Sequence, residues 1–247
     1  MNQPLWIRAT SLGLLLLLWQ LSAAQLQSNS LPPPSAVLAV GIEQWQSGEM
    51  ARHVLATLAR VAASFILAMG VGVALGIWMG AQDRVDRWLD APLMVALNIP
   101  ALVIIILSYV WLGLGEVAAV LAVALNKIPM VIVATREGAR AIDRQLMAVA
   151  KVYRLSPWRT LRQVYLPQLS PYLIGAARNG LSLVWKIVLV VELLGRSNGV
   201  GFALANYFHF FDVAGILAYT LSFTALMLAI EMGVMHPLER KLHRWRP

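Results

Sequence analysis

The chain has 247 residues, of which 59% are hydrophobic and only 13% are charged, and its formal net charge is +8. A soluble domain of this length needs far more charge on its surface, so a soluble globular protein is excluded. The absence of cysteine also excludes disulfides, iron–sulfur clusters and thiol catalysis.

Apolar residues gather in windows that are long enough to cross a membrane as helices. About 20 apolar residues span a hydrocarbon core that is roughly 30 Å thick. The pattern predicts an all-α, polytopic membrane protein with about six transmembrane helices. The predicted spans are Leu5 to Ala24, His53 to Met79, Pro92 to Leu112, Val117 to Thr135, Tyr172 to Leu194 and Ala214 to Met235.

The basic residues fall in alternate connections between these spans. The N-terminal segment, the second-to-third loop, the fourth-to-fifth loop and the tail carry fourteen of them, whereas the intervening loops carry only Arg52 and Arg196. Lys and Arg concentrate in cytoplasmic loops, so this bias predicts cytoplasmic N and C termini and a cytoplasmic fourth-to-fifth loop. The positive charge is therefore a signal of topology, and no nucleic-acid partner is predicted.

Three regions follow from this topology. Residues 1–51 combine the first span, a proline-rich extended linker at Ser30 to Val37 and a segment expected at the membrane interface. Residues 52–236 form the core, with a long loop at about 136–171, and residues 237–247 form a basic cytoplasmic tail. Arg8 and the leucines and small residues after it also fit a cleavable signal peptide, which would leave five spans.

The long loop contains two predicted helices. The first, at 136–153, has no proline and would extend the fourth span out of the membrane. The second begins with Ser156 as its N-cap and Pro157 at the first helical position, and it ends at Pro167 after about two turns. This helix would offer Trp158 and neighbouring arginines to a partner outside the membrane.

The loop resembles a signature of the membrane-spanning subunits of binding-protein-dependent ABC importers, particularly the branch for nitrate, sulfonates and taurine. The signature is E-A-A-x3-G-x9-I-x-L-P, with a further S-x-W-x-T-x-R pattern in this branch. The matching residues are Ala150, Ser156, Trp158, Thr160, Arg162, Val164 and Pro167. Ala148 replaces the glutamate and Arg154 replaces the glycine. Because a positive φ costs arginine on the order of 1 kcal/mol, we expect the turn to be built on Ser156 and Pro157.

The resemblance implies a type I ABC importer permease fold in the bacterial inner membrane. Two copies would pair with two ATPase subunits, which bind ATP and magnesium, and with a periplasmic solute-binding protein. The helix at 156–163 would be the coupling helix, and the residues implied to contact the ATPase are Ala150, Ser156, Trp158, Arg159, Thr160, Arg162, Val164 and Pro167. The chain itself would be no enzyme and would hold no cofactor or metal, since it lacks a G-x4-G-K-[ST] motif and metal-ligand spacing. The solute would be an oxyanion or organosulfur compound.

Polar residues inside the predicted spans are candidates for the solute path. They are Lys127, Asn179, Lys186 and Glu192. A charge at the centre of a membrane helix costs roughly 2.5 to 3.5 kcal/mol, so such groups usually face protein or water. The two lysines could pair with Glu192 or Glu231, or they could attract an anion such as a sulfonate.

The glycines that follow the fifth span are expected at the outer end of the path. Together with Glu192, a periplasmic gate or docking face would be formed by Gly195, Gly199 and Gly201. Arg60 lies near a span end, from which its long side chain can reach the interface. An alternative function, a stand-alone secondary transporter or channel, would use Lys127, Lys186 and Glu192, although the sequence shows no inverted repeat.

Overall fold

The computed structural model describes residues 5–26, 30–235 and 237. The described residues form helices and no strand, in the order α1 (Leu5–Leu26), α2 (Pro34–Gln46), α3 (Glu49–Ala81), α4 (Asp83–Asn98), α5 (Ala101–Leu112), α6 (Glu116–Arg140), α7 (Arg144–Val152), α8 (Pro157–Thr160), η1 (Leu161–Tyr165), α9 (Leu166–Gly195), α10 (Val200–His209), α11 (Val213–Ile230) and η2 (Glu231–Met235). The labels η1 and η2 denote single π-helical turns. The predicted all-α fold is confirmed. The basic tail, with Arg240 and Lys241, lies outside the described residues.

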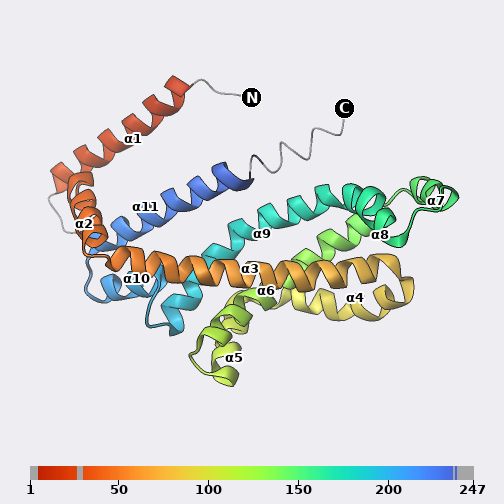
Figure 1. Cartoon of the computed structure of the whole chain (residues 1–247). Coiled ribbons are helices and arrows are strands. Elements are labelled where there is room, and N and C mark those ends of the chain that lie inside the picture. Colours follow the sequence, from red (N-terminus) through yellow and green to blue (C-terminus); the bar gives the residue numbers. More distant parts are fainter. Residues whose placement is uncertain (1–4, 27–29, 236, 238–247) are drawn as a thin grey trace.

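Three long helices, α3, α6 and α9, form the centre of the bundle (Figure 1). The backbones of α3 and α6 approach closely because small residues line the contact between them. The glycines of α3 meet Val131, Thr135 and Ala139 of α6 through Gly72, Gly76 and Gly80. A Cβ atom on Gly76 would lie only 2.6 Å from the Cβ atom of Thr135, so no larger residue fits there without a shift.

The two ends of the bundle are closed by different helices. At one end α2, α10 and α11 pack around the first turns of α3, and Tyr219 and Phe223 are buried there beside Met50. At the other end α4 packs against α3 and α6 through Leu93 and Ile132. The connection between α6 and α9 carries α7 beyond this second end (Figure 1).

The helices follow the predicted spans except in the third one. Among the described residues, four stretches are long and apolar enough to cross a membrane: Glu49–Ala81, Glu116–Arg140, Pro157–Gly195 and Val213–Gly233. The apolar α1 lies over the first predicted span, but its apolar part, Thr10–Leu26, is shorter than these four stretches, so the first span stays a prediction. The third predicted span, Pro92 to Leu112, is wrong as a continuous helix, because α4 and α5 meet there at 96°.

The break between α4 and α5 has a local cause. Ile99 precedes a proline and is extended, with φ −72° and ψ 124°, because the proline ring disfavours the helical conformation of the residue before it. Pro100 then caps the N-terminus of α5. The Nδ2 of Asn98 donates to the carbonyl oxygen of Met94 at 2.8 Å, which provides a partner for a carbonyl in the last turn of α4.

The proline-rich linker is less extended than predicted. α2 begins at Pro34, inside the predicted linker, because a proline fits the first helical turn, where its missing N–H is not needed. Val37 is already buried. The indole Nε1 of Trp19 donates to the carbonyl oxygen of Pro32 at 3.0 Å and ties α1 to this connection.

Replacing Gly76 with alanine tests the close approach of α3 and α6. The added Cβ would lie 2.6 Å from the Cβ of Thr135 and 2.8 Å from the backbone oxygen of Ile132. This overlap is expected to lower the free energy of unfolding by about 1 to 3 kcal/mol, measured by thermal unfolding in detergent. Gly70→Ala on the same helix is the control, because open space surrounds its Cβ position. Equal melting temperatures for the two variants would contradict the prediction.

Candidate functional site

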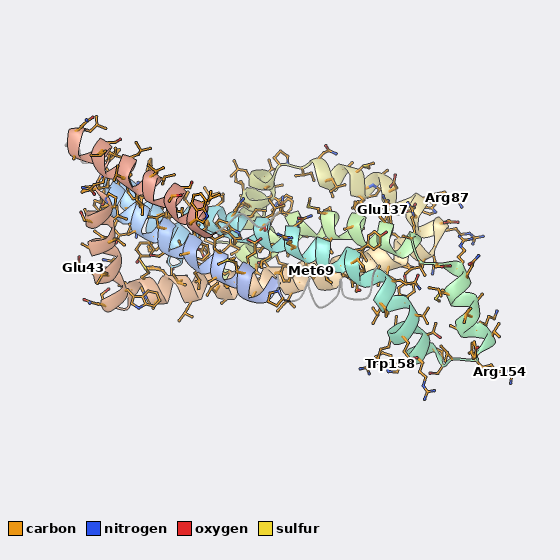
Figure 2. The ribbon with its side chains drawn as sticks, turned by 90° about the horizontal axis from the view of Figure 1, so that it is seen from above. Glu43, Met69, Arg87, Glu137, Arg154 and Trp158 are labelled. Carbon is orange, nitrogen blue, oxygen red and sulfur yellow. The ribbon has the colours of Figure 1, made fainter. Side chains whose placement is uncertain are left out.

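The connection between α6 and α9 folds into a helical hairpin that projects from the end of the bundle (Figure 2). We call residues 144–165 the α7–α8 hairpin. The prediction of one helix over 136–153 is wrong, because α6 ends at Arg140 and α7 starts separately. Asp143 is the N-cap of α7, and its carboxylate accepts hydrogen bonds from the N–H groups of Gln145 at 2.7 Å and Leu146 at 3.4 Å. These bonds give a partner to N–H groups of the first turn, which have no carbonyl partner within the helix.

The turn at the tip of the hairpin lies at the position where the ABC importer signature has glycine. Arg154 occupies it with a φ of +49°, so the expectation that the turn is built on Ser156 and Pro157 is wrong. The N–H of Leu155 donates to the carbonyl of Ala150, and the N–H of Arg154 donates to that of Lys151, both at 3.0 Å. These two bonds form a Schellman motif, which stabilises the left-handed residue that ends α7.

Ser156 and Pro157 start the second arm, as predicted. The hydroxyl of Ser156 accepts a hydrogen bond from the N–H of Arg159 at 3.4 Å, and Pro157 is the first helical residue. The predicted end at Pro167 is wrong, because α8, η1 and α9 form one helical stretch from Pro157 to Gly195.

The π-helical turn η1 lets the helix continue through this proline. The N–H of Leu166 donates to the carbonyl of Leu161, five residues back, which widens the helix just before Pro167. One turn later Pro171 lacks the N–H that would pair with the carbonyl of Pro167. The hydroxyl of Ser170 donates to that carbonyl instead, at 2.9 Å. The carbonyl freed by Pro171 therefore finds a side-chain partner.

The residues predicted to contact an ATPase occupy different parts of the hairpin. Trp158 is 67% exposed and, like Arg154, points away from the bundle (Figure 2). Arg159, Arg162 and Pro167 are also exposed, whereas Thr160 and Val164 are half-buried. Ala150 is buried and supplies a carbonyl to the turn, so it positions the hairpin without offering a surface.

The sequence analysis missed an apolar stripe on the outer side of α7. Leu146, Val149 and Val152 are exposed, as is Tyr153 beside them. Their spacing of three residues was the signal, because such residues lie near one another on a helix surface.

A second group of polar residues lies at the opposite end of the bundle, around two buried charges, Arg60 and Glu192. We call Arg60, Glu116, Glu192 and Asn198 the Arg60 cluster. Arg60 is only 4% exposed, so the expectation that it reaches the interface is wrong. Its guanidinium donates to both carboxylate oxygens of Glu116 at 2.6 and 2.8 Å and to Glu192 at 2.6 Å. It also donates to the backbone and side-chain oxygens of Asn198.

The cluster fixes the turn between α9 and α10. Glu192 is fully buried and accepts hydrogen bonds from the hydroxyl of Thr57 and the N–H of Gly201, both at 2.9 Å. Gly199 has a φ of +111°, and a Cβ there would overlap the carboxylate of Glu192. Gly195, the last residue of α9, packs against the ring of Tyr109. The predicted gate glycines therefore lie together in a tightly packed turn.

The structure does not bring the predicted path residues together. Lys127 is only 3% exposed, and its Nζ lies 3.0 Å from the sulfur of Met130. Asn179 and Lys186 are exposed on α9, while Glu192 is bound by Arg60. Within the described residues the lysines form no ion pair with Glu192 or Glu231, and Glu231 lies 3.8 Å from Arg178. The part these residues play in a solute path stays a prediction.

The sequence of the chain is similar to those of known transport proteins. The family model of the binding-protein-dependent transport system inner membrane component matches residues 72–236. The putative aliphatic sulfonates transport permease protein SsuC of Bacillus subtilis (strain 168) is 29% identical, over 98% of this chain and 88% of the relative. The taurine transport system permease protein TauC of Escherichia coli (strain K12) is 26% identical, over 94% of this chain and 86% of the relative.

The fold is also similar to that of a solved structure. A chain from the inward-facing MetNI methionine ABC transporter superposes with a TM-score of 0.69 at 17% identity. The match covers 80% of this chain and 97% of the other. The helical arrangement described above is thus shared with a permease of known structure.

Removing the Arg60 side chain tests the buried cluster. Arg60→Ala should lower the free energy of unfolding by about 3 to 5 kcal/mol, because it leaves the Glu192 carboxylate buried without a cation. Adding Glu192→Gln should recover part of this loss, since an amide needs no counter-charge. Arg52→Ala is the control, because the pair of Arg52 with Glu49 is exposed and such pairs contribute at most about 1 kcal/mol. If chemical denaturation in detergent gave equal losses for both single variants, the cluster would not hold this end.

Proposed function

We propose a transport function for this chain, which belongs to the family of binding-protein-dependent transport system inner membrane components. Two copies enclose the path of a small anion. The α7–α8 hairpin couples this path to an ATPase. The chain is a multi-pass permease subunit of an ABC importer and is no enzyme. The assembly that we infer contains a homodimer of this chain, two ATPase subunits that bind ATP and magnesium, and a periplasmic solute-binding protein.

The surface of the hairpin carries the proposal for coupling. α7 extends beyond the end of α3 (Figure 1), and Trp158 lies on the arm that projects to the side of the bundle (Figure 2). The rings of Trp158 and Tyr153 are both exposed there. From Arg144 to Tyr165 the chain has five basic residues and no acidic one. Exposed aromatic and arginine side chains are enriched in protein interfaces. We therefore assign this surface, centred on Trp158, to contact with the ATPase.

The continuity of α8, η1 and α9 supports a mechanical link. Because these elements form one helical stretch, a displacement of Trp158 by the ATPase is carried along the helix to the part of α9 that bears Lys186. Rigid movement of packed helices is a common form of conformational switching. Closure of the ATPase pair would then open the paired bundles to the outside.

Two observations support an anionic solute. Lys127 and Lys186 lie in the central part of α6 and α9, and within the described residues neither forms an ion pair with a carboxylate. The named solutes of the two relatives, aliphatic sulfonates and taurine, carry a sulfonate group. Lys186 shares its exposed face of α9 with Asn179, and a lysine facing lipid would cost roughly 2.5 to 3.5 kcal/mol. We propose that this face lines the path between the two copies.

The distribution of charge supports the orientation in the inner membrane. Arg87, Arg154 and Trp158 lie toward one end of the molecule and Glu43 toward the other (Figure 2). The end with the arginines would be cytoplasmic, as would both termini. The turn at Gly195, Gly199 and Gly201 would then face the periplasm and form part of the gate or of the docking face for the binding protein.

The double variant Trp158→Ala, Arg159→Ala tests the coupling surface. It should reduce the amount of ATPase that co-purifies with the chain at least about tenfold, which corresponds to roughly 1.4 kcal/mol of binding free energy. The measurement is the ratio of the two subunits after affinity purification in detergent.

The matched control replaces Arg87 and Trp88 on α4 with alanine. Trp88 is even more exposed than Trp158, but it lies outside the hairpin. A loss of ATPase from both double variants, or from neither, would count against the assigned surface. Solute uptake by the chain alone in liposomes would instead support a stand-alone transporter.

Lys186→Met tests the anionic path in the complete complex. Removing the ammonium group should slow ATP-driven uptake of taurine into proteoliposomes by about tenfold, whereas Lys186→Arg, which keeps the charge, should retain most of it. Leu183→Met on the same exposed face is the control. If Lys186→Met left uptake unchanged, Lys186 would not lie on the path.

A further inference from the structure

The α7–α8 hairpin borders a hollow, open to its surroundings on one side, that the ABC importer signature does not explain. The hollow has a volume of about 680 Å³ and lies between α7 and the second arm. Arg144, Met147, Ala148 and Lys151 line it from α7, and Leu161 and Tyr165 line it from the second arm. The four residues of α7 follow the spacing i, i+3, i+4 and i+7, so they form one face of the helix. The size is within the range of about 300 to 1,000 Å³ that is typical of ligand pockets.

The small side chain of Ala148 helps to keep this hollow open. Ala148 stands where the ABC importer signature has glutamate, so the chain lacks both the bulk and the negative charge of that residue. On this face of α7 the hollow is lined by the apolar Met147 and Ala148. Arg144 and Lys151 flank them, about two helical turns from each other.

The charge around the hollow has one sign. Two of the lining residues, Arg144 and Lys151, are basic and none is acidic, and neither forms an ion pair with another described residue. Asp143 precedes Arg144, but its carboxylate accepts hydrogen bonds from the N–H groups of Gln145 and Leu146. Cations without counter-charges at a concave surface favour an acidic partner.

We propose, building on the proposed coupling function, that this hollow receives an apolar side chain of the ATPase that is flanked by carboxylates. The apolar side chain fills the space above Ala148, and the carboxylates pair with Arg144 and Lys151. A glutamate at position 148 would attract a cation of the ATPase. Here alanine stands at that position, and the remaining charges, Arg144 and Lys151, attract carboxylates instead. A membrane surface does not fit the site, because a concave hollow takes up a protruding side chain, whereas the convex apolar stripe of Leu146 and Val149 lies on the far side of α7.

Filling the hollow is the first part of the test. In the complex of permease and ATPase, Ala148→Trp should reduce ATPase co-purification and ATP-driven uptake at least about tenfold. Val149→Trp adds the same ring to the adjacent exposed residue outside the hollow and should change neither. Unchanged melting temperatures of the permease in detergent show that both variants fold.

Comparing Ala148→Trp with the double variant Trp158→Ala, Arg159→Ala separates this inference from the proposed function. If Trp158→Ala, Arg159→Ala releases the ATPase while Ala148→Trp does not, the hollow is no docking site and the coupling surface stands. If neither change releases it, both are overturned. Equal losses for the two tryptophan variants would also overturn the hollow as the specific site.

Crosslinking identifies the occupant. The chain has no cysteine, so Ala148→Cys introduces its only thiol. A short reagent that joins this thiol to a photoreactive diazirine, which inserts into nearby bonds of any side chain, followed by mass spectrometry, should capture an ATPase peptide in which an apolar side chain is flanked by aspartate or glutamate. Lys151→Glu should weaken the complex, and a lysine in place of that carboxylate in the ATPase should restore it. Capture of a second copy of this chain, absence of an ATPase crosslink, or failure of the charge swap would overturn the proposal.

Discussion

The buried guanidinium of Arg60 is the interaction on which one end of the structure depends. It joins α3 to the first residue of α6, to Glu192 near the end of α9 and to the turn that leads into α10. Burying an ion pair is costly unless the remaining polar atoms are also satisfied. Here Glu192 receives further hydrogen bonds from Thr57 and Gly201. The cluster therefore specifies one arrangement of these helix ends, and the α9–α10 turn is a fixed platform more than a mobile flap.

The opposite end meets the need for backbone hydrogen bonds in a different way. Backbone polar groups that lose a helical partner near a proline need another partner. In the helix from 157 to 195 they do so through a π-helical turn, the hydroxyl of Ser170 and the amide of Gln168, which donates to the carbonyl of Val164 at 2.9 Å. Such turns are frequent at functional sites and break the regular hydrogen-bond ladder.

The sequence predicted those features that depend on local chemistry. The apolar windows located most helices, and Ser156 with Pro157 marked the start of the second arm. Two local rules failed where neighbouring structure outweighed them: the Schellman bonds around Arg154 hold a residue that should avoid a positive φ, and η1 lets a helix continue through Pro167. The pairing of Arg60 with Glu192 spans 132 residues, and only the packing of α3 against α9 reveals it. No spacing rule connects residues that far apart.

The two departures from the ABC importer signature now have different consequences. Arg154 keeps the shape of the turn, because it adopts the left-handed conformation that glycine would adopt. Ala148 changes the chemistry, because it removes a carboxylate from a surface that otherwise carries only cations. A partner discriminates by repulsion as well as by attraction, so an ATPase groove with cations for a glutamate would be repelled by Arg144 and Lys151. The same turn shape with one negative charge fewer would thus favour an ATPase whose contact surface carries carboxylates.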